Sequence, residues 1–294
     1  MSNYIHSIPP AVGHPPSAFF PSPPSARRHP LSPRRLLSLA AVRPPPSVVN
    51  PMSTPRKIRC TIEQVTDHGD RVYTITLKPE RPLPSFHPGQ FLHLALDEYD
   101  PSACWPESRV FSIASSPMER DRVRIVYSVK GVYTSRMEQE LVVGRGVWVK
   151  LPYGEFVVEG SREAVLIAGG TGITAYQAFI EGLAPDHSRK VVLLYGARTP
   201  GLLLARKVIE AKSRECPALK SIFFAESRCV EHGSHTGDEG IQEGRVSLEA
   251  LTGCGVGEDA LYYLAGPPLM VSALKAGLER EGIAPGNIRV DAWE

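Results

Sequence analysis

Two different rhythms of apolar and polar residues follow each other along this chain. Up to about Gly160, short runs rich in Val, Ile, Tyr and Thr alternate with polar residues, between turn residues such as Pro88-Gly89. A period of two is typical of half-buried strands. Closely spaced short strands of this kind predict an antiparallel barrel or sandwich. We expect strands over 72–77, 90–96, 110–114, 123–129 and 147–151, and a helix near 135–141.

After Gly160 the apolar runs become compact and nearly continuous, and most are separated by helical patterns. Apolar strands alternating with helices predict a parallel sheet covered on both faces, a doubly wound α/β fold. Ligands of such sheets bind at the carboxyl ends of the strands. The expected strands are 164–168, 191–195, 221–225, 261–264 and 288–290, and the expected helices are 174–183, 202–213, 246–251 and 268–281. The domains are therefore expected over 56–160 and 161–294.

Charge and proline separate the beginning of the chain from the rest. Residues 1–62 contain no Asp or Glu but eight basic residues, and 14 of the 28 prolines lie in residues 1–55. The whole chain has a net charge of +2, yet the remainder has 25 basic and 31 acidic residues, a net charge of −6. An acidic body argues against non-specific binding of nucleic acid. No stretch reaches the ~18–20 apolar residues of a transmembrane helix.

Residues 1–55 are predicted to be a disordered leader, because they lack the apolar content of a packed core. Two interpretations remain open. An acid-free segment rich in Ser and Arg fits a transit peptide, which implies a plastid or a mitochondrion. Alternatively, translation starts at Met52, immediately before the globular pattern, and the protein is cytoplasmic. N-terminal sequencing of the native protein distinguishes these origins.

The five cysteines are widely spaced and include no C-x-x-C pair. Local spacing therefore indicates neither a zinc site nor an iron–sulfur cluster, and it does not predict a disulfide framework. We expect no bound metal. The cysteines are Cys60, Cys104, Cys216, Cys229 and Cys254.

Two candidate motifs lie in the region of the expected barrel. Arg109-Val110-Phe111-Ser112 occupies an expected strand, where an exposed Arg beside a buried Phe is also an ordinary structural pattern. The segment Lys130-Gly131-Val132-Tyr133-Thr134-Ser135 precedes the short helix. Thr134 or Ser135 could cap that helix, and the same helix N-terminus could receive a phosphate.

Three further motifs lie in the region of the expected α/β domain. Gly169-Gly170-Thr171-Gly172 stands between a strand and a helix, where glycines let the backbone approach a pyrophosphate, although tight turns without ligands use them too. Gly266-Pro267-Pro268-Leu269-Met270 follows a later strand in the same way. The terminal segment Asp291-Ala292-Trp293-Glu294 places the aromatic ring of Trp293 beside the last residue.

In this order the motifs resemble the ferredoxin–NADP(+) reductase superfamily over roughly residues 57–294. The resemblance implies a flavin-binding antiparallel barrel followed by a nicotinamide-nucleotide-binding α/β domain. It implies a FAD-dependent NAD(P)H reductase that passes electrons to a protein or small-molecule acceptor. Two alternatives stay open: an electron-transfer subunit of a multi-chain oxygenase or hydrogenase-type complex, and a non-catalytic nucleotide-binding module.

The resemblance also implies a role for each motif. In the barrel, Arg109 would neutralise the flavin phosphate, Phe111 would line the isoalloxazine, and the Ser112 hydroxyl would lie near flavin N5. Gly131 and Thr134 would hold the pyrophosphate, and Thr134 favours FAD over FMN. Together with their neighbours, the cofactor-binding residues expected in the barrel are Arg109, Val110, Phe111, Ser112, Gly131, Thr134 and Ser135.

In the α/β domain the glycine motif would accept the pyrophosphate of NAD(P)H, and the later motif would flank the nicotinamide. Trp293 would cover the flavin, although an ordinary aromatic at the end of the chain explains it equally well, and Ser112 and Trp293 are the expected catalytic residues. The expected nucleotide-binding residues are Gly169, Gly170, Thr171, Gly172, Gly266, Pro267 and Met270.

The choice between NADPH and NADH depends on charge beside the adenosine ribose. Arg198 follows the second α/β strand and Ser227-Arg228 follows the third. This pattern resembles NADP-selective members and favours NADPH, whereas Glu226 could instead bind a ribose diol. Ala265 stands where many members have a cysteine close to the reacting carbon, which puts full ferredoxin–NADP reductase activity in doubt.

Overall fold

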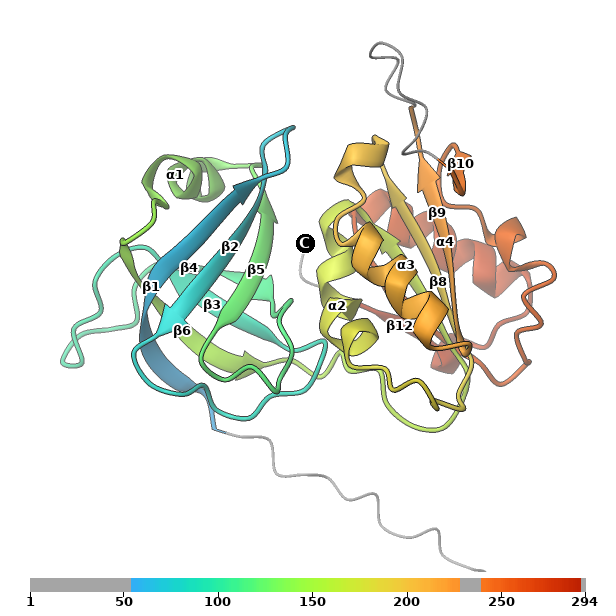
Figure 1. The fold of residues 1–294 in the computed structure, drawn as a ribbon, viewed down its shortest axis with the longest axis horizontal. Coiled ribbons are helices and arrows are strands. Elements are labelled where there is room, and N and C mark those ends of the chain that lie inside the picture. Colours follow the sequence, from blue (N-terminus) through green and yellow to red (C-terminus); the bar gives the residue numbers. More distant parts are fainter. Residues whose placement is uncertain (1–53, 228–238, 292–294) are drawn as a thin grey trace, which may run out of the picture. The chain divides into compact units, whose positions relative to one another are not determined.

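An antiparallel sheet that curls almost into a barrel forms the first part of the structure (Figure 1). The computed structural model describes residues 54–227 and 239–291. In this part of the chain the strand order is β4-β3-β6-β1-β2-β5. Helix α1 (Val132–Glu140) lies between β5 and β6 in the sequence. The strands are β1 (Arg56–Asp67), β2 (Val72–Pro79), β3 (Phe91–Ala95), β4 (Ser108–Ser112), β5 (Val123–Ser128) and β6 (Gly146–Tyr153).

Hydrogen bonds just beyond β4 close the gap between the two edge strands. The Ala114 N–H donates to the Arg124 carbonyl at 2.8 Å, and the Arg124 N–H donates to the Ser115 hydroxyl at 3.1 Å. Pairing of the edges removes the exposed hydrogen-bonding groups that an open sheet would present. The predicted antiparallel barrel is confirmed, as a near-barrel.

The longest strand, β1, is missing from the sequence-based prediction. Its side chains at Ile58, Cys60 and Ile62 are buried in the barrel core. Arg59 faces outward between them and contacts Glu80 and Glu98 at 3.4 and 2.8 Å. The strand therefore has the alternation of a half-buried strand, but its charged outer face and its position next to the basic leader obscure the signal.

The second part of the structure is a parallel sheet in the order β10-β9-β8-β7-β11-β12. Each neighbouring pair in this described sheet is parallel. The strands are β7 (Ala164–Gly169), β8 (Val191–Ala197), β9 (Leu219–Ala225), β10 (Ile241–Glu243), β11 (Leu261–Ala265) and β12 (Ile288–Val290). The α-helices that connect them are α2 (Thr174–Glu181), α3 (Arg206–Glu215) and α4 (Pro268–Arg280).

Strand β7 shows why helices cover both faces of this sheet. Successive side chains of a strand point to opposite faces. Leu166 packs in a cluster that contains residues of α2 and α3, whereas Val165 and Ile167 pack in a cluster with residues of α4. The apolar run of β7 is thus buried on both sides. The predicted doubly wound fold is confirmed.

Several helix boundaries differ from the sequence-based prediction. The helix expected over 202–213 begins only at Arg206, because Ala205 adopts a left-handed conformation with φ of 55° and separates it from a short 3₁₀ turn (Pro200–Leu202). The helix expected over 246–251 is a single 3₁₀ turn (Leu248–Leu251), in which the Ser247 hydroxyl accepts the Glu249 N–H. The glycine motif continues into a 3₁₀ turn (Gly170–Ile173) before α2 starts.

The described residues belong to one compact unit that includes both sheets. No helix within 54–227 or 239–291 is long and apolar enough to cross a membrane. The predicted leader, residues 1–55, lies almost entirely outside the described residues.

Candidate functional site

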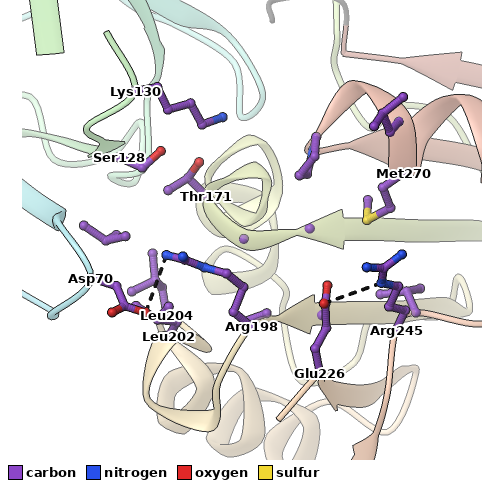
Figure 2. Close-up of a pocket in the computed structure, with 18 of the residues that line it drawn as sticks. Asp70, Ser128, Lys130, Thr171, Arg198, Leu202, Leu204, Glu226, Arg245 and Met270 are labelled. Atoms are coloured by element: carbon purple, nitrogen blue, oxygen red, sulfur yellow. Dashed lines mark ion pairs between the residues drawn. The ribbon is translucent and has the colours of Figure 1, made fainter.

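Residues from most of the predicted motifs line two adjoining cavities. The larger has a volume of about 760 Å³ and the smaller about 530 Å³. Both are lined by Ser128 at the end of β5, by Lys130, and by Thr171 in the 3₁₀ turn after β7. Figure 2 shows the larger cavity with these three side chains labelled. The predicted residues around the smaller cavity are Arg109, Val110, Phe111, Ser112, Thr134, Thr171, Gly172 and Gly266, and those around the larger are Gly169, Gly170, Thr171, Arg198, Pro267 and Met270.

The glycine motifs meet at the point where the strand order of the parallel sheet reverses. Strands β7 and β11 are direct neighbours, so the turn after each lies beside the other. A Cβ added to Gly172 would lie 2.5 Å from the Ala265 carbonyl oxygen, and one on Gly266 would lie 2.9 Å from the Gly169 nitrogen. These approaches are far shorter than ordinary contacts, so packing between the two turns alone requires Gly172 and Gly266.

Gly170 is different from its neighbours. Its φ is 53°, in the left-handed region that favours glycine, and a Cβ added there would meet no atom within 4 Å. It lines the larger cavity. Gly170 therefore lines the cavity without a side chain and with open space at its Cβ position, as close approach of a ligand requires.

Arg109 lies against an aromatic ring at the start of α1. Its guanidinium carbon is 4.6 Å from the centre of the Tyr133 ring, a cation–π contact. Its Nη2 also pairs with Glu107 at 2.8 Å. The Tyr133 hydroxyl donates to the Leu94 carbonyl at 2.7 Å, and burial raises the pKa of Tyr133 to about 12. Tyr133 consequently stays a neutral hydrogen-bond donor that holds Arg109 beside the helix.

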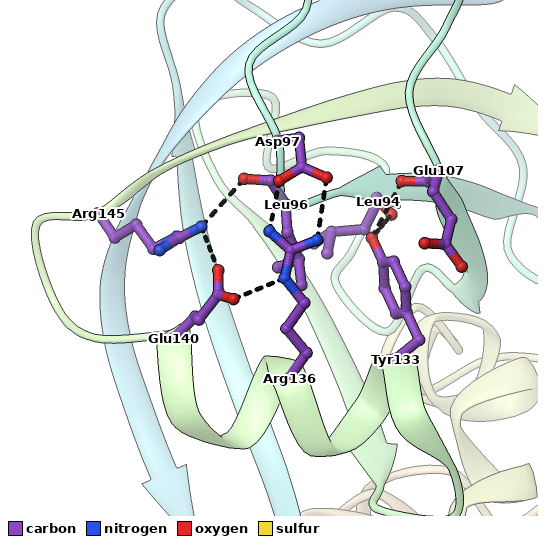
Figure 3. A network of polar contacts seen from close by, with 8 residues as sticks. All are labelled: Leu94, Leu96, Asp97, Glu107, Tyr133, Arg136, Glu140 and Arg145. Atoms are coloured by element: carbon purple, nitrogen blue, oxygen red, sulfur yellow. Dashed lines mark hydrogen bonds and ion pairs between the residues drawn. The ribbon is translucent and has the colours of Figure 1, made fainter.

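A charged network fixes α1 against the barrel (Figure 3). Arg136 makes two hydrogen bonds to Asp97, which follows β3, and its Nε donates to Glu140 at 2.6 Å. Arg145 joins the same Glu140 at 2.5 Å and the Leu96 carbonyl at 3.1 Å. The guanidinium of Arg136 lowers the pKa of Asp97. The contacts of Arg136 and Arg145 with Asp97, Glu140 and the Leu96 carbonyl thus hold α1 against the end of β3.

Thr134 takes part in capping α1, as expected for one of the two candidates, but it does so from the N3 position and not as the N-cap residue. The N-cap is Gly131, with an extended φ of −156°, and a Cβ there would meet nothing within 4 Å. The Thr134 hydroxyl instead accepts the N–H groups of Lys130 and Gly131 at 2.9 and 3.0 Å. Thr134 lines the smaller cavity, whereas Gly131 and Ser135 line neither.

Charged pairs stand around the larger cavity (Figure 2). Arg198, after β8, pairs with Asp70 of the β1–β2 hairpin at 3.5 Å, and Arg245 pairs with Glu226 at 3.5 Å. Ser227 does not line the cavity; its N–H and hydroxyl both donate to the Arg198 carbonyl, at 3.0 and 3.2 Å.

Some functional candidates lie beyond what the motifs indicated. Arg245 and Asp70 line the larger cavity, Asp291 lines the smaller, and Lys130 lines both. Lys130 begins the motif before the short helix and Asp291 begins the terminal segment that contains Trp293, but neither residue was assigned a role. Arg245 and Asp70 stand in a loop and at a hairpin tip without a recognisable motif. Arg228 and Trp293 lie outside the described residues.

Comparison with known proteins gives these cavities a family. Residues 166–276 match the family model described as "Oxidoreductase NAD-binding domain". The flavohemoprotein of Bacillus subtilis (strain 168) is 26% identical over 222 residues, covering 74% of this chain and 54% of the relative. The phenol hydroxylase P5 protein of Acinetobacter pittii is 29% identical over 240 residues, covering 80% and 65%. These matches make the chain similar to the ferredoxin reductase-like superfamily of FAD/NAD-binding proteins.

Solved structures show the fold of this superfamily. The cytochrome P450 reductase of Amycolatopsis superimposes with a TM-score of 0.68 at 22% identity, covering 81% of this chain and 70% of that one. The cytochrome b5 reductase domain of Ulva prolifera nitrate reductase gives 0.64 at 18% identity, covering 80% and 97%. Both agree with a near-barrel followed by a parallel sheet.

This similarity supports the resemblance drawn from the motifs. The chain spans about half the length of the curated relatives it matches. The roles of individual residues stay predictions.

Proposed function

We propose that this chain is a flavin-dependent NAD(P)H reductase, with the flavin ring in the smaller cavity and the dinucleotide in the larger. The observation that carries this proposal is the common wall of Ser128, Lys130 and Thr171. Two cofactors that exchange a hydride must bring their reacting ends together. Adjoining cavities allow this without movement of either sheet.

The residues of the smaller cavity fit a phosphate-bearing flavin. Thr134 lines this cavity in the first turn of α1, whose N–H groups have no intrahelical partner. Gly131, the N-cap residue beside it, is extended, and a Cβ added there would meet nothing within 4 Å. Arg109 adds a positive charge at the same helix end, held there by Tyr133. We assign FAD rather than FMN, on Thr134 at the start of this helix.

Bound FAD and nicotinamide nucleotide supply the hydride transfer and its division into single electrons. The chain's own residues hold and orient these groups. Arg109 balances the phosphate charge, and Phe111 and Ser112 form the wall where the ring would lie. Gly170 lets the backbone approach the dinucleotide, and Pro267 and Met270 bound its cavity on the side of α4.

The charges of the larger cavity support NADPH over NADH. Arg198 and Arg245 both line it and could bind a 2′-phosphate. Glu226 would repel such a phosphate, but its carboxylate is paired with Arg245. The carboxylate that could bind a ribose diol is therefore partly neutralised.

Flavin binding is tested with Arg109→Ala. We expect the purified protein to be yellow, and the variant to retain clearly less flavin per chain, because the counter-charge at the helix N-terminus is lost. The matched control is Arg122→Ala, since Arg122 is likewise exposed and paired with carboxylates but lines neither cavity. Equal flavin content in all three proteins contradicts the flavin site.

Cofactor preference is tested with Arg245→Ala. Loss of a charge-assisted contact of about 1.5–3 kcal/mol should raise KM for NADPH roughly tenfold or more while leaving KM for NADH nearly unchanged. Lys275→Ala is the control, because Lys275 is an exposed cation on α4 outside both cavities. An equal rise for both dinucleotides rules against the 2′-phosphate assignment.

The electron acceptor that we propose is a redox protein. Support comes from the likeness to the phenol hydroxylase P5 protein and to the reductase component of phenol 2-monooxygenase, 29% identical over 220 residues. NADPH-dependent reduction of ferricyanide by the chain alone would show a working flavin site. A chain that also turns over with ferredoxin alone would support a stand-alone reductase, and activity only with a co-purified partner would support the subunit alternative.

A further inference from the structure

The tip of the β1–β2 hairpin has an unusual backbone. The Val72 N–H donates to the Gly69 carbonyl at 2.9 Å across a four-residue turn. Its two central residues, Asp70 and Arg71, have φ of 50° and 59°. A turn with two positive φ values normally uses Asn-Gly or Asp-Gly, because other side chains are strained there. The conformation therefore needs support from neighbouring contacts.

Arg71 supplies that support on one side of the turn. Its Nε and Nη2 donate to Glu138 of α1 at 3.1 and 2.5 Å, and the Tyr73 hydroxyl donates to the same carboxylate at 3.0 Å. Asp67 accepts the Gly69 N–H at 2.8 Å. Hydrogen bonds within the hairpin tip and to Glu138 of α1 thus hold this turn in place.

Asp70 is directed to the larger cavity instead. Its Oδ2 lies 3.5 Å from Nη2 of Arg198, and both residues line that cavity (Figure 2). The Asp70 side chain is 52% exposed and the Arg198 side chain is 65% exposed. Exposed ion pairs are weak, so this pair can open readily. A guanidinium engaged by a carboxylate is nevertheless less available to a phosphate.

We propose that Asp70 is an internal competitor for Arg198, a carboxylate that a nucleotide phosphate displaces on binding. The inference rests on the proposed function, which places a dinucleotide in the larger cavity. The fixed turn keeps the carboxylate within reach of Arg198, so Asp70 lowers nucleotide affinity and favours release. Asp70 is a residue that determines affinity and has no chemical step of its own.

The test is Asp70→Asn, because Asn tolerates positive φ and the change removes only the charge. Dissociation constants for NADPH and NADH are measured calorimetrically at low salt. We expect about two- to fivefold tighter binding, the range of one exposed ion pair. A gain for NADPH alone supports competition with the 2′-phosphate, and a gain for both supports competition with the pyrophosphate.

Two further variants make the result specific. In an Arg198→Ala background, Asp70→Asn should change neither constant, because the contested group is gone. Asp121→Asn removes the same charge from an exposed Asp–Arg pair outside both cavities and should also have no effect. If Asp70→Asn does not fold, Asp70→Gly removes the charge at a φ that glycine adopts freely.

Unchanged or weaker binding in Asp70→Asn overturns the inference, and so does a gain that persists in the Arg198→Ala background. A wild-type protein that binds neither dinucleotide overturns the proposed function instead. The two failures are therefore distinguishable.

Discussion

Replacing Gly172 with alanine tests whether close packing of the turns after β7 and β11 requires glycine at this position. The added Cβ would lie 2.5 Å from the Ala265 oxygen and 2.6 Å from its carbonyl carbon, whereas ordinary contact begins at 3.4 Å. The clash is with backbone, so the turns after β7 and β11 must separate by roughly 0.9 Å to relieve it. Overpacking of this kind costs about 1–3 kcal/mol.

Thermal unfolding followed by circular dichroism measures this cost. For a chain of this size about 2 kcal/mol corresponds to a fall of about 4–8 °C in Tm. Gly201→Ala is the matched control, because a Cβ there meets nothing within 4 Å and its φ is not positive. We also expect Gly172→Ala to weaken flavin binding, since Gly172 and Gly266 both line the smaller cavity. Equal melting of the two variants would refute the packing argument.

Two further predictions concern the support of α1. Tyr133→Phe removes the hydrogen bonds to the Leu94 and Glu107 carbonyls and should lower the free energy of unfolding by about 1–2 kcal/mol, measured by urea titration, while the retained ring keeps flavin content unchanged. Lower flavin content would show that the hydroxyl acts at the site itself. Asp97→Asn should cost at most about 1 kcal/mol at pH 7, because the pair with Arg136 is half exposed. Because the pKa of Asp97 is lowered in the folded state, its contribution to stability is complete above the unfolded-state pKa near 4 and is lost as pH falls through the folded-state value. The Tm values of wild type and Asp97→Asn should therefore converge in acid. A Tm difference that stays constant down to pH 2 would contradict this prediction.

Local patterns predicted the architecture well because each apolar run has one clear physical meaning. Strand β7 is buried on both faces and reads as a continuous apolar segment, and β2 alternates as a half-buried strand does. Weaker signals were missed: β1 carries charges on its outer face, and β10 has only three residues. The 3₁₀ turn at 248–251 has a helical composition but is too short for an α-helix.

The candidate site was predictable only where a motif marks it. Arg109 and Gly170 stand in motifs and line the cavities as expected. Arg245 and Asp70 reach the larger cavity from a loop and a hairpin tip that are distant in the sequence, and long-range pairing of this kind leaves no local pattern. Ser227 also stands in a motif, but it does not line the larger cavity, and its hydroxyl donates to the Arg198 carbonyl.

The backbone contact between the turns after β7 and β11 also determines where this protein can tolerate change. A larger residue at Gly172 or Gly266 would disturb the turns after β7 and β11 together, so we expect neither position to tolerate substitution. The side chains of Arg198, Glu226 and Arg245 are 65%, 46% and 84% exposed, so they can be exchanged with little loss of stability. Redesign of the dinucleotide preference should therefore keep Gly172 and Gly266 and vary Arg198, Glu226 and Arg245.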